Sequence, residues 1–256
     1  MTDHRGRGVL ITGGAGGIGA ETAKAFLEQG AKVAIVDISS EALERTKAEL
    51  DGLGEVLTIT ANVTDEADVQ RYVQETLDAF GRIDVFFNNA GIEGRMGPFT
   101  DLSVDDFDRT FAINAKGVFL GLKHVAPVMA AAGGGAIINT SSEAGLDGSP
   151  NVLAYIGSKH AVTGITKAAA LEMAGTGVRI NSVHPSGVST EMVKRIAAGF
   201  AGPDGDPDAI DFSAAIPAGR LATPRDIANV VVFLGSDEAE FVTGAQWRVD
   251  GGVGAR

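Results

Sequence analysis

The fold is decided by residues 12–19, which read Thr12-Gly13-Gly14-Ala15-Gly16-Gly17-Ile18-Gly19. An apolar run over 8–12 leads into this stretch, and a helical pattern continues from it to Gln29. Glycines between a strand and a helix let a pyrophosphate approach the backbone, and the helix N-terminus offers it free N–H groups. The stretch predicts a dinucleotide-binding turn with cofactor contacts from Gly13, Ala15, Gly16, Gly17, Ile18 and Gly19. A turn that only packs helix against strand is the alternative.

The residues after the turn separate two classes of nucleotide site. A nucleoside-triphosphate loop needs Lys and Ser or Thr after its last glycine, whereas Ala20 and Glu21 follow Gly19 here. Asp37 ends the next apolar run, about 20 residues on, where an acid accepts hydrogen bonds from the adenosine ribose. Its charge would repel the 2′-phosphate of NADP, and no Lys or Arg occurs within 13–20 or 37–40. NAD is therefore the predicted cofactor, with an ordinary loop aspartate as the alternative.

Apolar runs and helical patterns alternate along the rest of the chain. Further strands are predicted over 32–37, 56–61, 84–88, 135–140, 178–183 and 245–249. Helices are predicted over 39–51, from Thr64, and over 103–131, 153–173 and 224–234. Strands that are apolar throughout and separated by helices indicate a parallel sheet that is covered on both faces. We expect an α/β fold: one doubly wound, Rossmann-like sheet in a single domain over 1–256, with a Gly/Pro-rich loop over about 186–216.

Composition excludes several classes of function. The 256-residue chain has a formal net charge of −12, which gives no attraction for nucleic acid or an anionic membrane, so a small-molecule substrate is the expected partner. Without cysteine, thiolate catalysis and cysteine zinc sites are excluded. The four histidines lack metal-ligand spacing, so no metal is predicted and each is expected to be structural or exposed. Because residues 1–8 lack the apolar stretch of a signal peptide, a cytoplasmic location is expected.

Tyr155 and Lys159 lie four residues apart in a predicted helix, so they share one face. An ammonium group one turn away stabilises a phenolate, which predicts a tyrosine acid/base whose pKa the lysine lowers. Ser142 follows a predicted strand, at the edge where α/β sheets bind ligands, and can hold a substrate oxygen beside Tyr155. A Tyr–Lys contact without a role and a capping serine are the alternatives. No Gly-x-Ser-x-Gly elbow occurs, so a serine hydrolase is not predicted.

Over nearly its whole length the chain resembles the short-chain dehydrogenases/reductases. The resemblance is carried by Thr12-Gly13-x-x-x-Gly17-x-Gly19, Asn88-Asn89-Ala90-Gly91, Tyr155-x-x-x-Lys159, Ser142, Asn114 and Val249-Asp250-Gly251-Gly252. It implies that Tyr155 is the general acid/base, that Lys159 holds the nicotinamide ribose, and that Ser142 positions the carbonyl. It also implies that Asn114 holds a water that links Lys159 to solvent.

The same resemblance implies further cofactor contacts and shows two departures. The implied contacts are Ile38, Asn62, Val63, Asn89, Ala90, Gly91, Tyr155, Lys159, Pro185, Gly187, Val188 and Thr190. Asn62 stands where the family usually has an aspartate beside adenine, and its carbonyl is expected to serve instead. Ser186 replaces a glycine, so its hydroxyl is expected to face cofactor or substrate.

The substrate is expected to lie under a lid formed by 186–216. Glu93, Arg95, Ser142, Ser186 and Met192 are its expected contacts. The predicted activity is hydride transfer between NAD(H) and a secondary alcohol or ketone, with a cyclic or apolar substrate favoured and oxidation as the expected direction. The alternatives are an NADPH-dependent 3-oxoacyl reductase and a non-catalytic dinucleotide-binding regulator.

The resemblance also implies a homotetramer built partly from the helices over 103–131 and 153–173. Val118, Leu122 and Val125 can serve either this interface or the core.

Overall fold

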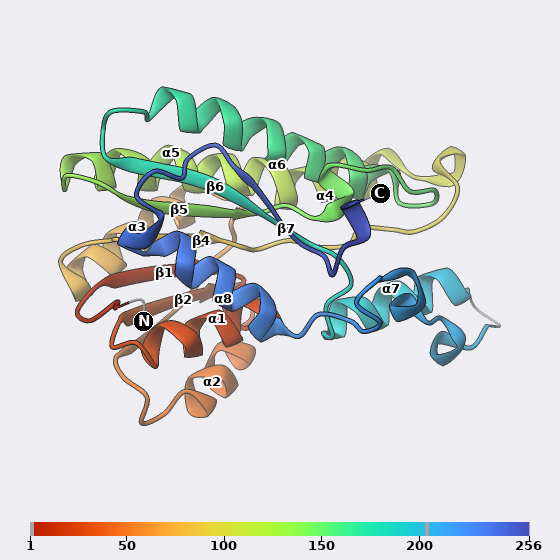
Figure 1. Cartoon of the computed structure of the whole chain (residues 1–256), viewed down its shortest axis with the longest axis horizontal. Helices are drawn as coiled ribbons and strands as arrows, with labels where there is room; N and C mark the ends of the chain where they lie inside the picture. The colour runs from red at the N-terminus through yellow and green to blue at the C-terminus, as the bar shows by residue number, and fades with distance from the viewer. Residues whose placement is uncertain (1–2, 203–204, 256) are drawn as a thin grey trace.

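The computed structural model describes residues 3–202 and 205–255, and its centre is a seven-stranded sheet (Figure 1). The strands are β1 (Gly8–Thr12), β2 (Lys32–Asp37), β3 (Val56–Thr60), β4 (Val85–Asn88), β5 (Gly135–Thr140), β6 (Val178–Pro185) and β7 (Gln246–Val249). They pair in parallel in the order β3-β2-β1-β4-β5-β6-β7. The chain winds outward from β1 in one direction and then returns to β4 on the other side. This confirms the doubly wound prediction, and the strand order reverses between β1 and β4, where open α/β sheets bind their ligands beyond the carboxyl ends of the strands.

Helices cover both faces of the sheet, as predicted (Figure 1). On one face, α1 (Gly17–Leu27), α2 (Ser40–Glu49) and α8 (Pro224–Gly235) bury residues such as Phe26, Leu43 and Val231. On the other face lie α3 (Glu66–Phe80), α5 (Gly117–Ala131) and α6 (Leu153–Glu172). The second core contains Val118, Leu122 and Val125, so these three side chains pack against the sheet.

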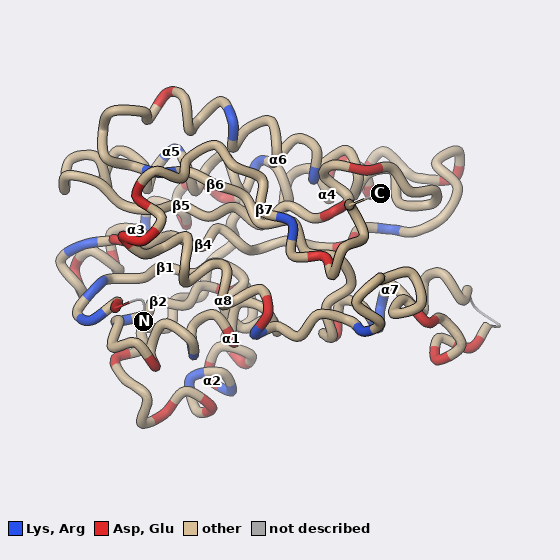
Figure 2. The backbone as a smooth tube through the Cα atoms, viewed as in Figure 1, with Lys and Arg blue, Asp and Glu red and all other residues tan. Residues whose placement is uncertain are grey.

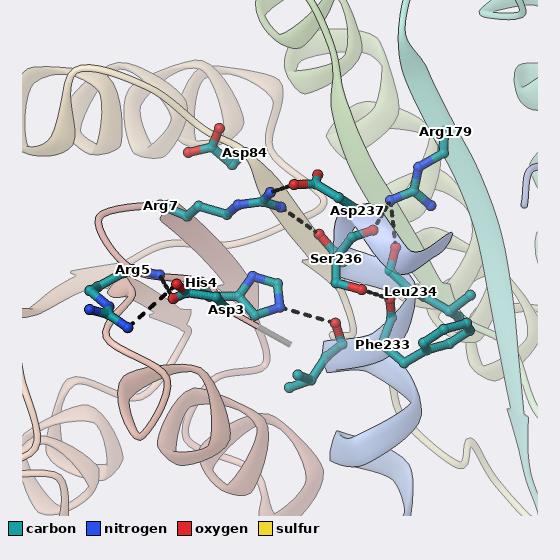
Figure 3. Close-up of polar contacts among 12 residues, drawn as sticks. Asp3, His4, Arg5, Arg7, Asp84, Arg179, Phe233, Leu234, Ser236 and Asp237 are labelled. Carbon is teal, nitrogen blue, oxygen red and sulfur yellow. Dashed lines mark hydrogen bonds and ion pairs between the residues drawn. The ribbon is translucent and has the colours of Figure 1, made fainter. Parts of the chain in front are cut away.

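Polar side chains fix the ends of several helices. The hydroxyl of Ser39 and the carboxylate of Asp65 accept N–H bonds at the starts of α2 and α3. Thr223 and Asp226 form a capping box at the start of α8. At the other end of α8, Arg7 donates to the Gly235 carbonyl, and Arg179 donates to the carbonyls of Leu234 and Ser236. Figure 3 shows these two arginines converging on that helix end, where cations complement the helix dipole.

The helix predicted over 103–131 is interrupted. The structure has α4 (Val104–Phe111), then a π turn over Ala112–Lys116, then α5. The side chain of Asn114, inside the π turn, bonds both the N–H and the carbonyl of Ile92. The extra residue in the turn is invisible in a hydrophobic pattern, yet it places Asn114 beside the segment that follows β4.

The prediction of a loop throughout 186–216 is wrong. Helix α7 (Glu191–Ala201) occupies its first part, and short 3-10 turns at Pro207–Ala209 and Phe212–Ala215 follow. Glu191 in the first turn of α7 complements the helix dipole, and Gly202, at φ 74°, ends the helix. In Figure 1, α7 lies beyond the end of the sheet, away from the two helix layers.

Two features are absent from the described residues. None of their helices is long and apolar enough to cross a membrane. No group of three or more His, Cys, Asp or Glu among them could hold a metal ion. Figure 2 shows the charged positions mainly on the helices and loops around the sheet, with both signs interspersed.

Candidate active site

The glycine turn leaves the start of α1 open to a ligand. A methyl group at Gly19 would lie 2.1 Å from the Gly13 carbonyl oxygen, and one at Gly14 would lie 2.6 Å from Ile35 Cβ. These contacts require glycine, because no side chain fits between turn, helix and sheet. Gly16 caps α1 without a side-chain hydrogen bond, and both Gly16 and Gly17 are exposed. The first N–H groups of α1 are therefore available to an anion such as a pyrophosphate.

Asp37 lies at the carboxyl end of β2, next to this turn. Its two carboxylate oxygens accept the N–H groups of Ala15, at 3.3 Å, and Ser39, at 3.2 Å. Among the described residues it forms no ion pair, and the neighbouring Ile38 is 71% exposed. A carboxylate held by two backbone N–H groups beside an open apolar surface fits the ribose and adenine of a dinucleotide.

Asn62 departs from the expectation made for it. Its side-chain carbonyl accepts both the N–H of Thr64, at 3.0 Å, and the hydroxyl of Thr64, at 2.9 Å. Both lone pairs of this oxygen are therefore occupied, so the predicted carbonyl contact with adenine is not available in this conformation. The side-chain NH₂ group remains as a donor. Val63 next to it packs close to Gly117, where an added methyl group would lie 3.0 Å from Val63 Cγ2.

The Asn88–Gly91 segment ties the ends of three strands together. The side chain of Asn88 donates to the carbonyl of Val118 and to the side-chain oxygen of Asn139. Asn89 donates to the carbonyl of Thr12, and Thr140 donates to Asn89 Oδ1 at 3.1 Å. The segment therefore links the carboxyl ends of β1, β4 and β5, and Ala90 and Gly91 are half-buried beside them.

Ser142 and Tyr155 meet above the carboxyl end of β5. The Ser142 side chain lies close enough to the phenol of Tyr155 to lower its pKa, and the Ser142 hydroxyl donates to the carbonyl oxygen of Pro185 at 3.4 Å. Burial is the largest influence on the phenol and raises the pKa of Tyr155; Ser142 lowers it, and the charge of Glu93 raises it. The pKa of Tyr155 is therefore raised and not lowered as expected, because desolvation of a phenolate outweighs the influence of Ser142.

Lys159 lies behind the tyrosine and is 4% exposed. Its Nζ donates to the carbonyl of Thr140 at 2.8 Å and lies 5.6 Å from the centroid of the Tyr155 ring. Burial lowers the pKa of Lys159 to about 8. The ammonium is thus still mostly charged at neutral pH, next to the half-buried phenol.

Asn114 joins this group through Gly91. A methyl group added at Gly91 would lie 3.2 Å from Asn114 Oδ1 and 3.5 Å from Lys159 Nζ, so both polar groups border the same point. The amide of Asn114 also donates to the hydroxyl of Ser158, which in turn donates to the Tyr155 carbonyl. Sequence reasoning missed Ser158, although it stands directly before Lys159.

The segment after β6 runs beside the glycine turn. A methyl group added at Gly17 would lie 2.8 Å from Thr190 Cγ2, which places Thr190 beside the glycine turn. Val188 bridges to Ala222, and Gly187 packs against Leu221. The Ser186 hydroxyl is buried and bonds no atom of the described chain. Ser186 lines a pocket of about 340 Å³ together with Ile216, Arg248 and Val249.

The expected substrate residues do not form one cluster. Glu93 is ion-paired with Arg195 of α7, with Glu93 Oε1 2.5 Å from Arg195 Nε and the Glu93 side chain 15% exposed. Arg95 points instead toward α4, 3.5 Å from Asp106, and its side chain is 58% exposed. Met192 is half-buried on α7. Arg195 was not predicted, because nothing in the sequence pairs it with a residue 102 positions away.

Comparison with known proteins identifies the family. A family model described as Enoyl-(Acyl carrier protein) reductase matches residues 13–254. The chain is 42% identical to levodione reductase of Leifsonia aquatica over 97% of this chain and 94% of that protein, and the solved levodione reductase structure superposes with a TM-score of 0.94 over 98% of each chain.

Two further relatives agree. The chain is 40% identical to cyclohexanol dehydrogenase of Acinetobacter sp. (strain SE19) over 94% of this chain and 92% of that protein. A structure of NAD+-bound xylitol dehydrogenase is 35% identical, with a TM-score of 0.93 over 97% of this chain and 99% of that one. With the glycine turn, Ser142, Tyr155 and Lys159 at one sheet edge, the chain belongs to the short-chain dehydrogenase/reductase family of oxidoreductases that act on CH–OH groups.

Proposed function

We propose that this protein is an NAD-dependent oxidoreductase that interconverts a cyclic or apolar secondary alcohol and its ketone. The observation that carries the proposal is the grouping of three side chains: Ser142 acts on the Tyr155 phenol, and Lys159 Nζ lies 5.6 Å from the centroid of the Tyr155 ring. We further propose that residues 1–256 form one domain and that 186–216, including α7, is the substrate lid.

Each catalytic side chain has one task in this proposal. The bound dinucleotide supplies or accepts the hydride. Tyr155 gives a proton to the carbonyl oxygen during reduction and takes it from the hydroxyl during oxidation. Ser142 holds that oxygen beside the phenol, and the Lys159 ammonium favours the phenolate left after donation. Because burial raises the pKa of Tyr155, the phenol is protonated at neutral pH, ready to act as the acid.

Asp37 supports NAD as the cofactor. Its carboxylate is fixed by Ala15 and Ser39 at the position expected for the ribose hydroxyls, and a 2′-phosphate there would meet a negative charge. A relative of this chain has been solved with NAD+ bound. The proposed cofactor contacts are those expected from the sequence, except that Asn62 would contribute its NH₂ group and not its carbonyl.

The names of the relatives support a cyclic substrate. Levodione, cyclohexanol and borneol, named in three of them, are cyclic ketones or alcohols. The half-buried Met192 and Ile196 of α7 offer apolar surface for such a ring. The charge of Asp37 speaks against an NADPH-dependent 3-oxoacyl reductase, because it would repel the 2′-phosphate of NADPH. The grouping of Ser142, Tyr155 and Lys159 speaks against a regulator without catalysis, because such a protein would not require these three side chains.

A homotetramer is the proposed assembly. Val118, Leu122 and Val125 are in the core and cannot form its interface. Phe119, Leu153 and Leu171 on α5 and α6 are 50%, 46% and 79% exposed and supply apolar surface on these helices instead. A cytoplasmic location remains a prediction from the sequence.

The test is turnover with NAD or NADP on a panel of cyclic, linear, sugar and steroid alcohols, followed by Tyr155→Phe. We expect Tyr155→Phe to lower kcat by about 100- to 10,000-fold, the usual contribution of acid/base catalysis, while NAD still binds. Tyr72→Phe is the matched control, because Tyr72 is the only other tyrosine, is fully buried, and its hydroxyl bonds no described atom. Full activity of Tyr155→Phe would refute the proposal, and turnover only with NADP would refute the role of Asp37.

A further inference from the structure

His184 is a buried polar residue that has no role in the catalytic site as described above. It lies near the end of β6, is 0% exposed, and was expected to be merely structural or exposed. Its Nδ1 lies 2.8 Å from the carbonyl oxygen of Ser142, and its Nε2 lies 2.8 Å from the hydroxyl of Ser182. The imidazole therefore bridges the interior of β6 to the serine that contacts Tyr155.

The chemistry of the two partners fixes where the proton sits. A carbonyl oxygen can only accept, so Nδ1 must carry the hydrogen. Burial lowers the pKa of His184 to about 4, so the ring is neutral at pH 7 and Nε2 is an acceptor. The Ser182 hydroxyl therefore donates to Nε2, and the histidine donates to Ser142. Both ring nitrogens are satisfied only in this tautomer.

The bond from His184 completes a fixed backbone around Ser142. The same carbonyl also accepts the N–H of Gly145 at 2.9 Å, which begins the 3-10 turn Glu143–Gly145. The Ser142 hydroxyl accepts the N–H of Ala144 at 3.2 Å. Two donors therefore hold the carbonyl of this residue, and a third N–H holds the hydroxyl that acts on the Tyr155 phenol. A small rotation of the Ser142 peptide would move that hydroxyl away from Tyr155.

We propose that His184 is a positioning residue for catalysis: through its Nδ1–H it holds the Ser142 carbonyl so that the Ser142 hydroxyl stays beside the Tyr155 phenol, with Ser182 fixing the tautomer. The proposal rests on the proposed function, in which Ser142 holds the substrate oxygen. A buried side chain that holds a catalytic group in place affects catalysis without touching the substrate. A histidine that served packing alone would not need this tautomer.

Two substitutions separate the two bonds. The amide nitrogen of His184→Asn lies about where Nδ1 lies and can still donate to Ser142, whereas His184→Gln reaches about as far as Nε2 and keeps only the partner Ser182. With cyclohexanol and NAD, we expect His184→Gln to lower kcat at least about tenfold, as befits loss of a buried hydrogen bond. KM should change little, because the bond orients the reacting oxygen and not the remainder of the substrate. His184→Asn should stay within about threefold of the wild type, and the Kd for NAD should be unchanged in both.

His4 provides the matched control. It is also 0% exposed and its Nε2 bonds a carbonyl, that of Val232 at 3.1 Å. It lies before the amino end of β1, beside Arg7 and α8 (Figure 3), whereas the catalytic side chains follow the carboxyl ends of the strands. His4→Gln should reduce thermal stability and leave kcat unaltered. Equal kcat in His184→Gln and wild type, or equal loss in the Asn and Gln variants, would overturn the proposal.

NMR of the wild type tests the proposal without turnover, and so it still applies if the His184 variants fail to fold. Nitrogen-15 NMR of histidine-labelled protein should show His184 protonated at Nδ1, and Ser182→Ala should weaken that preference and lower kcat by a few-fold. If the His184 ring of the wild type were protonated at Nε2, this result alone would overturn the proposal. If no alcohol or ketone in the panel is turned over by the wild type, the proposed function fails instead, a result distinct from an active wild type with an active His184→Gln variant.

Discussion

Replacing Lys159 by methionine should abolish turnover and yet make the folded protein more stable at neutral pH. Burial lowers the pKa of Lys159 from 10.5 to about 8. Each pKa unit corresponds to 1.36 kcal/mol, so keeping this ammonium charged in the folded protein costs about 3 kcal/mol. Methionine is similar in length and has no charge to desolvate. It leaves the Thr140 carbonyl without its donor, which costs on the order of 2 kcal/mol. The net expectation is a gain of about 1 kcal/mol for Lys159→Met.

The pH dependence gives this prediction a second, sharper form. The folded protein loses the Lys159 proton near pH 8, whereas the unfolded chain keeps it up to 10.5. Between these values the unfolded state binds more protons, so wild-type stability rises with pH. From about pH 7 to about pH 9.5 the wild type should gain about 2 kcal/mol over Lys159→Met. The order of stability should therefore reverse.

Urea denaturation of both proteins at equal concentration and at the two pH values measures this difference. Comparing the proteins with each other cancels groups that titrate in both. A Lys159→Met variant that is less stable at neutral pH by several kcal/mol would refute the argument, since the buried charge would then be compensated. A stability difference independent of pH would refute the assignment of the lowered pKa to Lys159.

Three further predictions test other parts of the site and fold. Asp37→Ala should raise the Kd for NAD about tenfold and lower that for NADP, because the charge that repels the 2′-phosphate is gone, as measured by calorimetry; equal losses for both cofactors would contradict a ribose contact. Glu93→Gln removes a charge that raises the pKa of Tyr155, so the pH profile of alcohol oxidation should move to lower pH; no movement would show that Arg195 already screens Glu93. Thr223→Ala should cost about 1 kcal/mol in urea denaturation by removing the capping hydroxyl of α8, with kcat unaffected; a loss of kcat would place this helix end within the catalytic machinery.

The strands of the sheet could be predicted from the sequence because the pattern that marks each strand lies within a few neighbouring residues. The strands predicted over 32–37 and 135–140 end at the same residues in the structure, since each is an apolar run closed by a polar residue or a turn. The glycine turn and the Tyr155–Lys159 spacing likewise depend on neighbouring residues. All the residues expected in catalysis, Asn114, Ser142, Tyr155 and Lys159, lie together in the structure.

What could not be read depends on contacts between distant segments. The π turn at Asn114 follows from its bonds to Ile92, and the orientation of Glu93 follows from Arg195 on α7. The glycines and prolines around 186–216 indicated a loop, but Glu191–Ala201 itself contains no proline and a single glycine, Gly199, and it forms helix α7. The predicted direction of the Tyr155 pKa shift is wrong, because the spacing of Tyr155 and Lys159 reveals the nearby lysine and does not reveal how deeply both groups are buried.

Three polar side chains around Tyr155 have hydrogen-bond acceptors of the same kind, namely backbone carbonyls near strand ends. Lys159, Asn114 and His184 each donate to a backbone carbonyl just beyond, or at, the end of β4 or β5, namely those of Thr140, Ile92 and Ser142. At these strand ends the ladder stops, so carbonyls are free to accept side-chain donors. A neutral carbonyl satisfies a donor but does not compensate a charge. The neutral Asn114 and His184 can therefore be buried at little cost, whereas the charge of Lys159 cannot. The residue that the proposed mechanism requires to be charged, Lys159, is thus the one whose burial the fold leaves uncompensated.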